Sequence, residues 1–476
     1  MKIALVNPNF EGSLESKRAY IPLGLAYIAA VLRDSRRHEI KVIDASALDL
    51  SDEEVERQLR DFNPGIVGVG AVTDLLGAAL NVCRIGKKIG AKTVLGGTHP
   101  TILPEETLAF DGVDIIAIGE GEYTLLELAD SLENGKSLKK VKGIMYKQKN
   151  KSKKIEFIRT HDRELIKDLD TLPLPARDLF PWKLYSSYSS IIRQTPCMHI
   201  MTSRGCPFHC TFCASQNLWK GCRARTAKNI ADEIEHLIKD FGVKELYLFD
   251  DTFNLNLKRC EEICDEIIKR RIKISLRVQA RVAPINKEIL IKMKKAGVWC
   301  IYYGIESGNQ EVLNDIKKAI TPEQVKHAFK ITEEAGIRTF GFFMIGLPKD
   351  NKKTIQDTLN LALEINPDFA NFTILVIYPG TEIYDLAVKE GSIKKIKPGE
   401  LFKPPLYSNK NISKEDLQKE LARIYKKVYL RPGYLFRRLI RIRTFTELKA
   451  NIMAGLPFLK GKNPFIVAKK WISIED

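Results

Sequence analysis

Apolar runs of β-strand length alternate with amphipathic, helix-like patterns over residues 1 to 135. The predicted strands are Lys2–Val6, Ile40–Ile43, Ile66–Val69, Thr93–Leu95 and Ile115–Ile118. The predicted helices between them include Leu23–Leu32, Glu53–Asp61 and Leu76–Ile89. This alternation is typical of a parallel sheet covered by helices on both faces. We therefore expect an α/β, doubly wound, Rossmann-like domain that binds its ligand beyond the carboxyl ends of the strands.

The same alternation resumes at residue 196 and continues to residue 408. The predicted strands there are His199–Thr202, Glu245–Phe249, Lys273–Arg277, Trp299–Tyr303, Arg338–Ile345 and Phe372–Ile377. Six strand–helix units predict an open, partial (β/α)6 barrel of the TIM type, with its chemistry at the carboxyl ends of the strands. The polar, proline-marked residues 136 to 195 are predicted to be an interdomain linker with some strand content.

Composition indicates how many domains the protein has and in which compartment it lies. The chain has 476 residues, of which 44% are hydrophobic, so two or three globular domains are expected. Its apolar runs are all too short for a membrane span, and its first residues turn polar too soon for a signal peptide. Nine cysteines without a regular framework fit a reducing compartment. These features predict a cytoplasmic protein.

The net charge and the C-terminal region suggest possible partners. The formal charge of +17 fits a nucleic-acid partner, an anionic lipid surface or a lysine-rich proteome. Residues 409 to 476 are predicted to be helical and basic, with helices at Asp416–Tyr429, Tyr434–Arg443 and Glu447–Leu456 before Trp471. The sequence shows no nucleic-acid-binding barrel beside this helical tail, so a nucleic-acid partner is disfavoured.

The second of these helices is basic and amphipathic. Its arginines alternate with apolar residues, and the set comprises Leu435, Phe436, Arg437, Arg438, Leu439, Ile440, Arg441 and Arg443. A helix of this kind can lie in the interface of an anionic membrane. The alternative is a helix that packs on the barrel with its arginines in solvent. Peripheral membrane contact is thus an open alternative to a purely cytoplasmic location.

Three cysteines follow the first strand of the predicted barrel. Cys206, Cys210 and Cys213 form a C-x₃-C-x₂-C run within residues 201 to 213. Three thiolates this close can hold one iron–sulfur cluster and leave one of its four irons open to a substrate. The alternative is a zinc knuckle with Cys197, His209 or Cys222 as the fourth ligand.

Polar residues also follow the later strands of the barrel. Asp250 and Asp251 end the second strand, where two carboxylates suit acid–base chemistry or cation binding, and Asp251 could also cap a helix. Arg281 follows the third strand and has the planar donor geometry that a carboxylate needs, although it could equally be a surface residue. Tyr303-Gly-Ile-Glu-Ser-Gly308 ends the fourth strand, and a carboxylate such as Glu306 can accept hydrogen bonds from two adjacent hydroxyls.

The cysteine run, with Phe212 before its last cysteine, resembles the radical SAM superfamily. The resemblance implies a 4Fe–4S cluster whose open iron chelates S-adenosylmethionine (SAM), which one electron then cleaves to a 5′-deoxyadenosyl radical. An electron donor such as ferredoxin or flavodoxin is implied. The residues implied to contact SAM are Phe212, Asp250, Asp251, Arg281, Glu306, Ser307 and Gly346.

Other segments resemble the radical SAM proteins that carry an N-terminal cobalamin-binding domain. These are Gly96-Gly-Thr-His-Pro100, Gly119-Glu-Gly-Glu122, Gly341-Phe-Phe-Met-Ile-Gly-Leu-Pro348 and Tyr378-Pro-Gly-Thr381, and the resemblance covers nearly all of the chain. The residues implied to contact cobalamin are Asn7, Asn9, Thr73, Gly96, Gly97, His99, Gly119, Glu120 and Gly121. No G-x-G-x-x-G opens the first helix, so a nicotinamide dinucleotide is disfavoured.

One departure from that subgroup concerns the cobalt ligand. Cobalamin domains that supply a histidine to cobalt carry it in a D-x-H-x-x-G segment after the first strand. This chain has Asn7-Pro-Asn-Phe-Glu-Gly12, with Asn9 at the histidine position. An amide binds cobalt poorly compared with an imidazole. We therefore expect cobalt without a protein histidine beneath it, and His99 as a loop residue.

The resemblance implies an enzyme that uses SAM and cobalamin on an unactivated carbon of a small molecule, including a lipid or other hydrophobic substrate. Methyl transfer is the favoured reaction. Oxidative ring closure, as in the anaerobic protoporphyrin ester cyclases, is the rival. An RNA-modifying enzyme is disfavoured by the helical tail, and a non-catalytic cobalamin or redox sensor would leave Asp250 and Glu306 without a purpose. No second cysteine cluster is evident, which argues against the auxiliary-cluster families.

Overall fold

The computed structural model describes residues 1–12, 14–185, 191–448 and 451. The chain forms two compact units. The first comprises Met1–Ser186, Ala214–Lys220 and Tyr378–Pro404, and the second comprises the rest of the described chain. Among the helices in these ranges, none combines the length and the apolar composition that crossing a membrane requires.

The first unit is built on a seven-stranded sheet with the order β2-β1-β3-β4-β5-β6-β7. Its parallel strands are β1 (Lys2–Asn7), β2 (Glu39–Asp44), β3 (Ile66–Gly70), β4 (Lys92–Gly96) and β5 (Ile115–Ala117). All five predicted strands are therefore formed. A hairpin of β6 (Ile144–Lys149) and β7 (Ile155–Arg159) extends the sheet in antiparallel fashion, and it comes from the segment predicted as a linker with some strand content.

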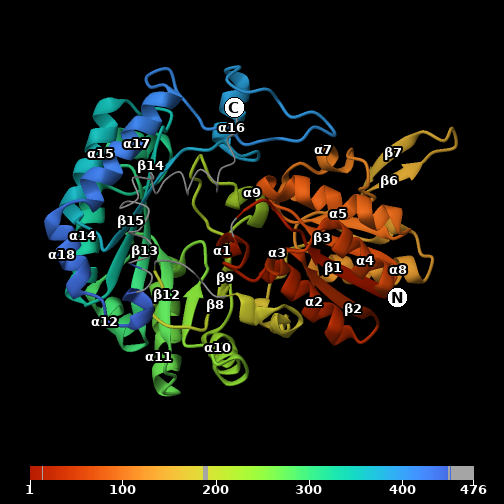
Figure 1. The fold of residues 1–476 in the computed structure, drawn as a ribbon, viewed down its shortest axis with the longest axis horizontal. Coiled ribbons are helices and arrows are strands. Elements are labelled where there is room, and N and C mark those ends of the chain that lie inside the picture. The colour runs from red at the N-terminus through yellow and green to blue at the C-terminus, as the bar shows by residue number, and fades with distance from the viewer. Residues whose placement is uncertain (13, 186–190, 449–450, 452–476) are drawn as a thin grey trace. The chain divides into compact units, whose positions relative to one another are not determined.

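Helices cover both faces of this sheet, as Figure 1 shows. One core layer includes Val55, Leu59 and Leu80, and the other includes Leu32 and Leu128. The helices are α1 (Leu14–Lys17), α2 (Leu23–Ser35), α3 (Ala45–Leu48), α4 (Asp52–Phe62), α5 (Leu76–Lys88), α6 (Thr98–Ile102), α7 (Pro104–Leu108) and α8 (Glu122–Glu133). Short 3-10 turns are η1 (Thr73–Leu75), η2 (Leu138–Lys140), η3 (Leu169–Thr171), η4 (Arg177–Leu179) and η5 (Trp182–Leu184). This is the doubly wound, Rossmann-like fold that the alternating pattern predicts.

Two pieces of the later sequence belong to this first unit. They carry α9 (Ser215–Trp219) and α16 (Glu382–Lys389). The Tyr378 hydroxyl donates to Asp74 Oδ2 at 3.0 Å, in the loop after β3. The Gly399 N–H donates to the Glu106 carbonyl oxygen at 3.0 Å, in α7. These contacts place residues 378–404 against the loops that follow β3 and β4.

The second unit holds six parallel strands in sequence order, with β8 and β15 at the two edges. They are β8 (Cys197–Ile200), β11 (Glu245–Leu248), β12 (Ser275–Ala280), β13 (Val298–Glu306), β14 (Arg338–Ile345) and β15 (Phe369–Ile374). The connections carry β9 (Ser203–Arg204), β10 (Arg223–Ala224), α10 (Ala227–Phe241), η6 (Phe253–Leu255), α11 (Leu257–Lys269), α12 (Lys287–Lys295), α13 (Gln310–Asp315), α14 (Pro322–Glu334) and α15 (Lys352–Ile365). Open edges and sequential order confirm the partial barrel.

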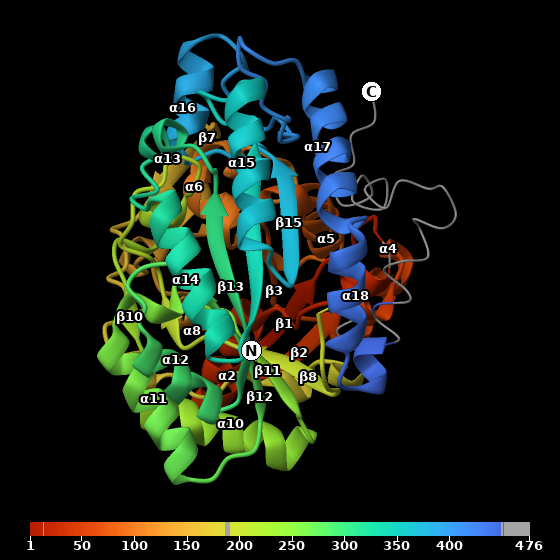
Figure 2. The same ribbon diagram turned by 90° about the vertical axis from the view of Figure 1, so that its left-hand side faces the viewer.

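The tail continues with α17 (Lys414–Tyr429) and α18 (Pro432–Ile440), which lie beside β15 (Figure 2). Hydroxyl groups join them to the barrel. The Tyr425 hydroxyl accepts from Phe372 N at 3.1 Å, and the Tyr434 hydroxyl donates to Asp368 O at 2.8 Å. The first two predicted tail helices are thus confirmed. Most of the third, Glu447–Leu456, and Trp471 lie outside the described residues.

Candidate active site and cofactor surfaces

The three cysteines lie on the loop that leaves the carboxyl end of β8. Cys206 and Cys210 are half-buried, and Cys213 is exposed. Cys206 Sγ lies 3.7 Å from Thr252 Oγ1, and the Cys213 N–H donates to the Cys210 carbonyl oxygen at 3.0 Å. Burial raises the pKa of Cys210, while the charges of Lys318 and Arg281 oppose that rise. Because the thiolate is the metal ligand, these two cations favour the form that binds iron.

Asp250 anchors the start of the cysteine loop. Its buried carboxylate accepts from Thr202 N at 2.7 Å and from Ser203 N at 3.0 Å, and it also accepts from the Thr202 hydroxyl. Arg259 of α11 donates to Thr202 O at 2.6 Å. Both oxygens of Asp250 therefore bind protein donors. This places Asp250 as the residue that fixes the backbone ahead of Cys206.

Asp251 is exposed at the same strand end. The alternative prediction that it caps a helix is wrong. The turn η6 follows first, beginning after Thr252, and α11 is capped instead by Asn256, whose side chain accepts from Arg259 N. Asp251 thus stands at the carboxyl end of β11, the edge where barrel chemistry is expected.

Glu306 and Lys318 form a buried ion pair. Lys318 Nζ lies 2.8 Å from Glu306 Oε1, and the two side chains are only 9% and 10% exposed. Glu306 has a φ of +68°, and the pairing of β13 with β14 shifts register between Gly304 and Glu306. A Cβ on Gly304 would lie 2.9 Å from both charged atoms, so glycine leaves room for the pair. Strained backbone and a bulge at a strand end are typical of functional sites.

Arg281 is buried, so the alternative that it is a surface residue is wrong. Its guanidinium carbon lies 3.7 Å from the centre of the Phe208 ring, within the cysteine loop. It also donates to the Lys318 carbonyl oxygen, and its own N–H donates to Asn254 Oδ1 at 2.8 Å. Arg281 and the Glu306–Lys318 pair therefore lie together beside the cysteine loop. Lys318 was not among the predicted residues, since nothing in its local sequence marks it.

The other predicted SAM residues have structural contacts of their own. Ser307 is buried, and its hydroxyl lies 3.3 Å from Thr358 Oγ1 and accepts from Asn309 N. Gly346 has a φ of +81°, and a Cβ there would lie 3.0 Å from Leu417 of α17. Phe212 is half-buried in the cysteine loop. Ser307 and Gly346 thus shape the loops after β13 and β14.

The zinc alternative fits the structure poorly. Cys197 lies at the amino end of β8, where its sulfur accepts from Arg277 at 3.2 Å, so it is at the opposite end of the strand from the loop. In the described part of the chain, no three His, Cys, Asp or Glu side chains converge on a position for one metal ion. A four-iron cluster suits thiols spread along a loop, because each thiolate binds a different iron. The remaining core cysteines are inert, since burial raises the pKa of Cys83, Cys260 and Cys264 to about 12.

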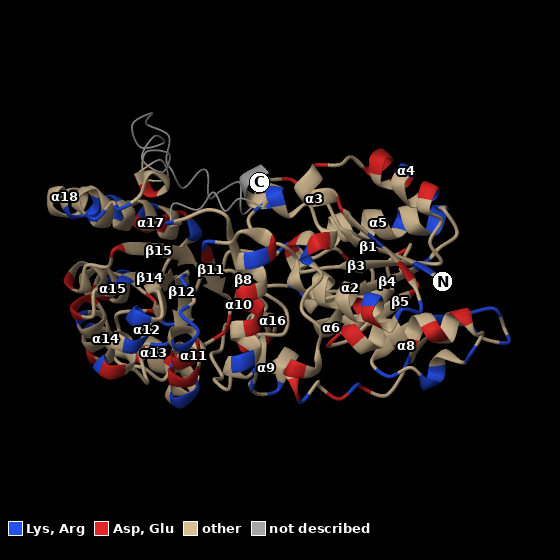
Figure 3. Ribbon diagram, turned by 90° about the horizontal axis from the view of Figure 1, so that it is seen from below, with Lys and Arg blue, Asp and Glu red and all other residues tan. Residues whose placement is uncertain are grey.

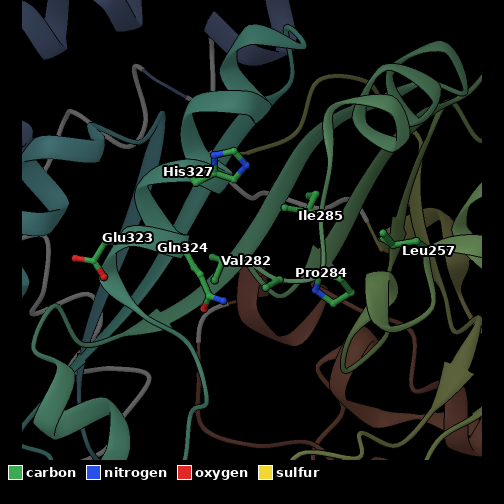
Figure 4. Close-up of a pocket in the computed structure, with 8 residues that line it drawn as sticks. Leu257, Val282, Pro284, Ile285, Glu323, Gln324 and His327 are labelled. Atoms are coloured by element: carbon green, nitrogen blue, oxygen red, sulfur yellow. The ribbon is translucent and has the colours of Figure 1, made fainter.

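A separate pocket of about 440 Å³ opens between the loop after β12 and the start of α14 (Figure 4). Its lining is mainly apolar and comprises Leu257, Val282, Ala283, Pro284, Ile285, Glu323, Gln324 and His327. None of the cysteines or predicted SAM residues lines it. This pocket is therefore separate from the loop cluster around Cys210.

The predicted cobalamin residues lie on loops at the carboxyl ends of β1, β3, β4 and β5. Asn7 donates to Asp44 Oδ1 at 2.7 Å, and the Tyr185 hydroxyl donates to the other Asp44 oxygen at 2.5 Å. Asn9 donates to Leu50 O at 2.9 Å, and its own Oδ1 is buried without a partner in the described residues. The Asn9 amide is thus held by its own unit through its nitrogen.

Thr73 and His99 join the loops after β3 and β4. His99 Nδ1 lies 3.1 Å from Thr73 Oγ1, and burial lowers the pKa of His99 to about 4, so the ring is neutral at pH 7. Gly97 has a φ of +106°, and a Cβ there would lie 2.6 Å from the Ala71 carbonyl oxygen. Gly96, whose added Cβ would lie 3.5 Å from Ala117 Cβ, ends β4. Glycine at position 97 is therefore required by the close approach of the Ala71 backbone within this unit.

In the loop after β5, Gly119 differs from Glu120 and Gly121 in what surrounds it. Gly119 has a φ of +77° and open space where a Cβ would stand. Glu120 is buried, and its carboxylate accepts from Ile166 N at 2.7 Å, so it holds the segment after β7. A Cβ on Gly121 would lie 2.9 Å from Ile28 of α2. Only Gly119 of these three therefore presents bare backbone at the edge of the sheet.

Comparison with known proteins agrees with both units. The B12 binding domain family matches residues 14–129, and the Radical SAM superfamily matches residues 200–362. An uncharacterised methyltransferase of Pyrococcus horikoshii is 34% identical over 444 residues, which cover 92% of this chain and 94% of that protein. The anaerobic magnesium-protoporphyrin IX monomethyl ester cyclase of Rubrivivax gelatinosus is 29% identical over 81% of this chain and 69% of its own length.

Two solved structures share the fold. The cobalamin-dependent SAM radical enzyme OxsB, with aqua-cobalamin and SAM bound, has a TM-score of 0.74 and 18% identity over 98% of this chain and 72% of its own. The radical SAM methyltransferase TsrM of Kitasatospora setae has a TM-score of 0.70 and 18% identity over 89% of this chain and 83% of its own. The chain belongs to the radical SAM enzymes that carry an N-terminal B12-binding domain, and its cofactors are a 4Fe–4S cluster, SAM and cobalamin.

Proposed function

We propose that this enzyme transfers a methyl group to an unactivated carbon of a small-molecule substrate. The observation that carries the proposal is the similarity to a methyltransferase over 92% of this chain and 94% of the relative, which spans both cofactor units. The similarity to the cyclases is lower and covers 69% of the Rubrivivax gelatinosus protein. When bound, the cluster with SAM supplies a hydrogen-abstracting carbon radical, and cobalamin supplies a transferable methyl group.

The residues around the cysteine loop each contact a different part of the cluster or of SAM. Cys206, Cys210 and Cys213 hold the cluster. Asp251 accepts from the SAM ammonium, because it is the exposed carboxylate at the end of β11. Glu306 accepts from the ribose hydroxyls and is held in place by Lys318, while Arg281 offers a planar cation to the carboxylate end.

The electron reaches the cluster from a donor protein of the ferredoxin or flavodoxin type. Cys213 and Lys317 are both exposed, so this side of the cysteine loop is open to such a donor. An acidic donor would be drawn to the exposed cation of Lys317 beside the loop. The donor itself is to be identified by measuring SAM cleavage with each reduced protein in turn.

Anaerobic reconstitution with iron, sulfide, SAM and methylcobalamin tests the reaction. The loaded enzyme is incubated with lipid and small-molecule extracts, and products are sought by mass spectrometry. With a carbon label on the methyl groups of both SAM and methylcobalamin, methyl transfer predicts a product that gains one labelled methyl carbon. A product that has lost two hydrogens and gained no label would instead establish ring closure, and the methyl-transfer proposal would then fail.

We expect the bound cobalamin to lack a protein histidine on cobalt. Asn9 stands at the histidine position, and His99 is buried and bonded to Thr73. Electron paramagnetic resonance of the cob(II)alamin form should show no nitrogen hyperfine splitting from an axial base. A nitrogen-split signal that disappears in His99→Ala would contradict this expectation, and Asn9→Ala serves as the matched control on the other loop.

The tail helix α18 packs on the barrel, but the alternative that its arginines lie in solvent is wrong. Its arginines point to the barrel: Arg437 donates to Pro367 O at 2.9 Å, Arg441 to Glu333 Oε1 at 2.6 Å, and Arg438 lies 3.9 Å from the centre of the Phe369 ring. Carboxylates and carbonyl groups on the barrel outcompete water for these guanidinium groups, because Arg forms several donor contacts at once. The apolar side chains are consequently left on the outside.

That outer face is the proposed site of membrane contact. Leu435, Phe436, Leu439 and Ile440 are 52%, 67%, 65% and 53% exposed. The exposed cations Lys426, Lys427 and Arg443 flank them along the chain, and Figure 3 shows the basic residues of α17 and α18. An apolar face with cations at its margin fits the interface of an anionic membrane.

Substitution of Phe436 and Leu439 by serine should weaken vesicle binding at least tenfold, since each side chain would lose about 2 kcal/mol of apolar burial. Co-sedimentation with vesicles of phosphatidylcholine and phosphatidylglycerol measures this. Ile291→Ser, on an exposed position of α12, is the matched control and should bind like the parent protein. Equal binding of the parent protein, the double variant and Ile291→Ser, or no binding of the parent at low salt, would contradict the proposed membrane contact. Loss of dimerisation in the double variant would show instead that a second copy covers this face.

A further inference from the structure

A second pocket, which is polar, lies at the end of the barrel opposite to the cysteine loop. It has a volume of about 300 Å³. It is lined by Arg193, Lys294, Glu333, Gly336, Ile337, Arg338, Arg441 and Arg443. Arg338 begins β14, and Arg193 precedes β8, so the pocket stands at the amino ends of the strands. Chemistry in barrels of this type occurs at the other end, and the pocket is therefore a site separate from the one that holds SAM.

Positive charge exceeds negative charge in this pocket. Five basic side chains line it, and three carboxylates form ion pairs with some of them. Arg441 binds Glu333 at 2.6 Å and also Asp368. Arg338 and Arg193 share Glu447, at 3.1 Å and 3.4 Å. The carboxylates therefore neutralise three of the five cations.

Lys294 and Arg443 are the two cations of the pocket whose side chains form no ion pair with these carboxylates. Lys294 Nζ donates to the Gly336 carbonyl oxygen, and Arg443 Nη1 donates to the Ile440 carbonyl oxygen at 3.0 Å. Neither side-chain cation forms an ion pair with a carboxylate among the described residues, and Arg443 contacts Glu447 only through its backbone N–H, at 2.7 Å from Oε2. Burial lowers the pKa of Lys294, and the neighbouring charges of Arg193 and Arg338 lower it further. A bound anion would relieve this repulsion.

Two of the arginines are also held rigidly. The guanidinium carbons of Arg193 and Arg338 lie 5.4 Å and 5.5 Å from the centre of the Trp299 ring. Trp299 is 3% exposed, and its indole nitrogen is buried without a hydrogen-bond acceptor in the described residues. Planar cations fixed in this way lose little entropy when they bind a tetrahedral oxyanion. Two of the cations that line the pocket are thus held in fixed positions before any anion binds.

We propose that this pocket binds a phosphate group. Guanidinium groups bind phosphate oxygens in pairs, and a lysine adds a point charge, which matches the four arginines and Lys294. The phosphate could belong to a soluble phosphate ester or to a phospholipid headgroup, because both present the same oxygens. Arg441 and Arg443 follow α18 directly, so a headgroup here would stand next to the apolar face of that helix.

The test uses the full chain with Lys294→Gln and Arg443→Gln together. Neither residue has a carboxylate to leave unpaired, so the variant should fold, and its iron content and circular dichroism should equal those of the parent. Calorimetric titration with inorganic phosphate and with pyrophosphate should show binding to the parent protein and at least a tenfold rise in Kd for the variant. The control variant Lys239→Gln with Lys269→Gln, on α10 and α11, removes the same charge elsewhere.

The arms of the experiment separate the two sources of phosphate. Binding of the soluble anions that only the pocket variant loses supports a phosphate-ester site. Absence of soluble binding, with phosphatidylglycerol vesicle binding that falls in Lys294→Gln alone and not in the control variant, supports a lipid headgroup site, because Lys294 lies outside the apolar face of α18 and its flanking cations. Equal losses in the pocket and control variants would show diffuse surface attraction and overturn the proposal, as would binding of neither the soluble anions nor the vesicles.

Discussion

Replacement of Cys206, Cys210 and Cys213 by alanine should abolish both the bound iron and the cleavage of SAM. We propose the three thiolates of the cysteine loop as the iron ligands, and none of the three forms a disulfide within the described part of the chain. The fold should persist, because Asp250 holds the start of the loop through Thr202 and Ser203 without any contribution from the thiols. Iron analysis and the anaerobic yield of 5′-deoxyadenosine measure the two losses.

Cys222 provides the control for this experiment. It is half-buried and lies close enough to Cys206 and Asp250 for their charges to affect it, and burial raises its pKa. It stands outside the C-x₃-C-x₂-C run, so Cys222→Ala should keep both the iron and the activity. Production of 5′-deoxyadenosine by the triple variant would refute the ligand assignment, and loss of the cluster in Cys222→Ala would make that residue a ligand as well.

The strands were predictable because burial on both faces of a parallel sheet leaves continuous apolar runs in the sequence. Their ends were less predictable. β13 continues to Glu306, three residues beyond the predicted Tyr303, through an irregularity at Gly304 that has no apolar signal. β15 begins at Phe369, three residues before the predicted Phe372, because its pairing with β14 starts at Phe340. Pairing partners decide such ends, and they are remote in the sequence.

The candidate site was predictable where a short motif carries the chemistry, as the cysteine run does. Lys318 was missed because its partner Glu306 becomes a neighbour only when the loop after α13 folds back. The orientation of α18 was missed for a similar reason. Its alternating pattern defines two faces, and the choice between them depends on Glu333 and Asp368, which lie on distant elements. The hydrogen bond from Tyr378 to Asp74 likewise joins residues that are far apart in the sequence.

The Glu306–Lys318 pair allows a test that separates SAM binding from folding. Lys318→Met leaves a buried carboxylate without its partner, and breaking such a pair typically costs about 3–5 kcal/mol of stability. Glu306→Gln combined with Lys318→Met removes both charges and should recover most of that loss, because no unpaired charge remains. Thermal unfolding of the single and double variants under anaerobic conditions measures the recovery.

SAM cleavage should not recover with stability in the same double variant. If Glu306 accepts from the ribose, the loss of a charged hydrogen bond is worth about 1.5–3 kcal/mol, which lowers SAM affinity roughly tenfold to a hundredfold. Glu306→Gln alone should show this loss of affinity while the iron content stays at the parent level, since the cysteines are intact. A double variant that regains both stability and normal SAM affinity would show that the pair serves folding alone. A Glu306→Gln enzyme that binds SAM normally would likewise remove Glu306 from the cofactor site.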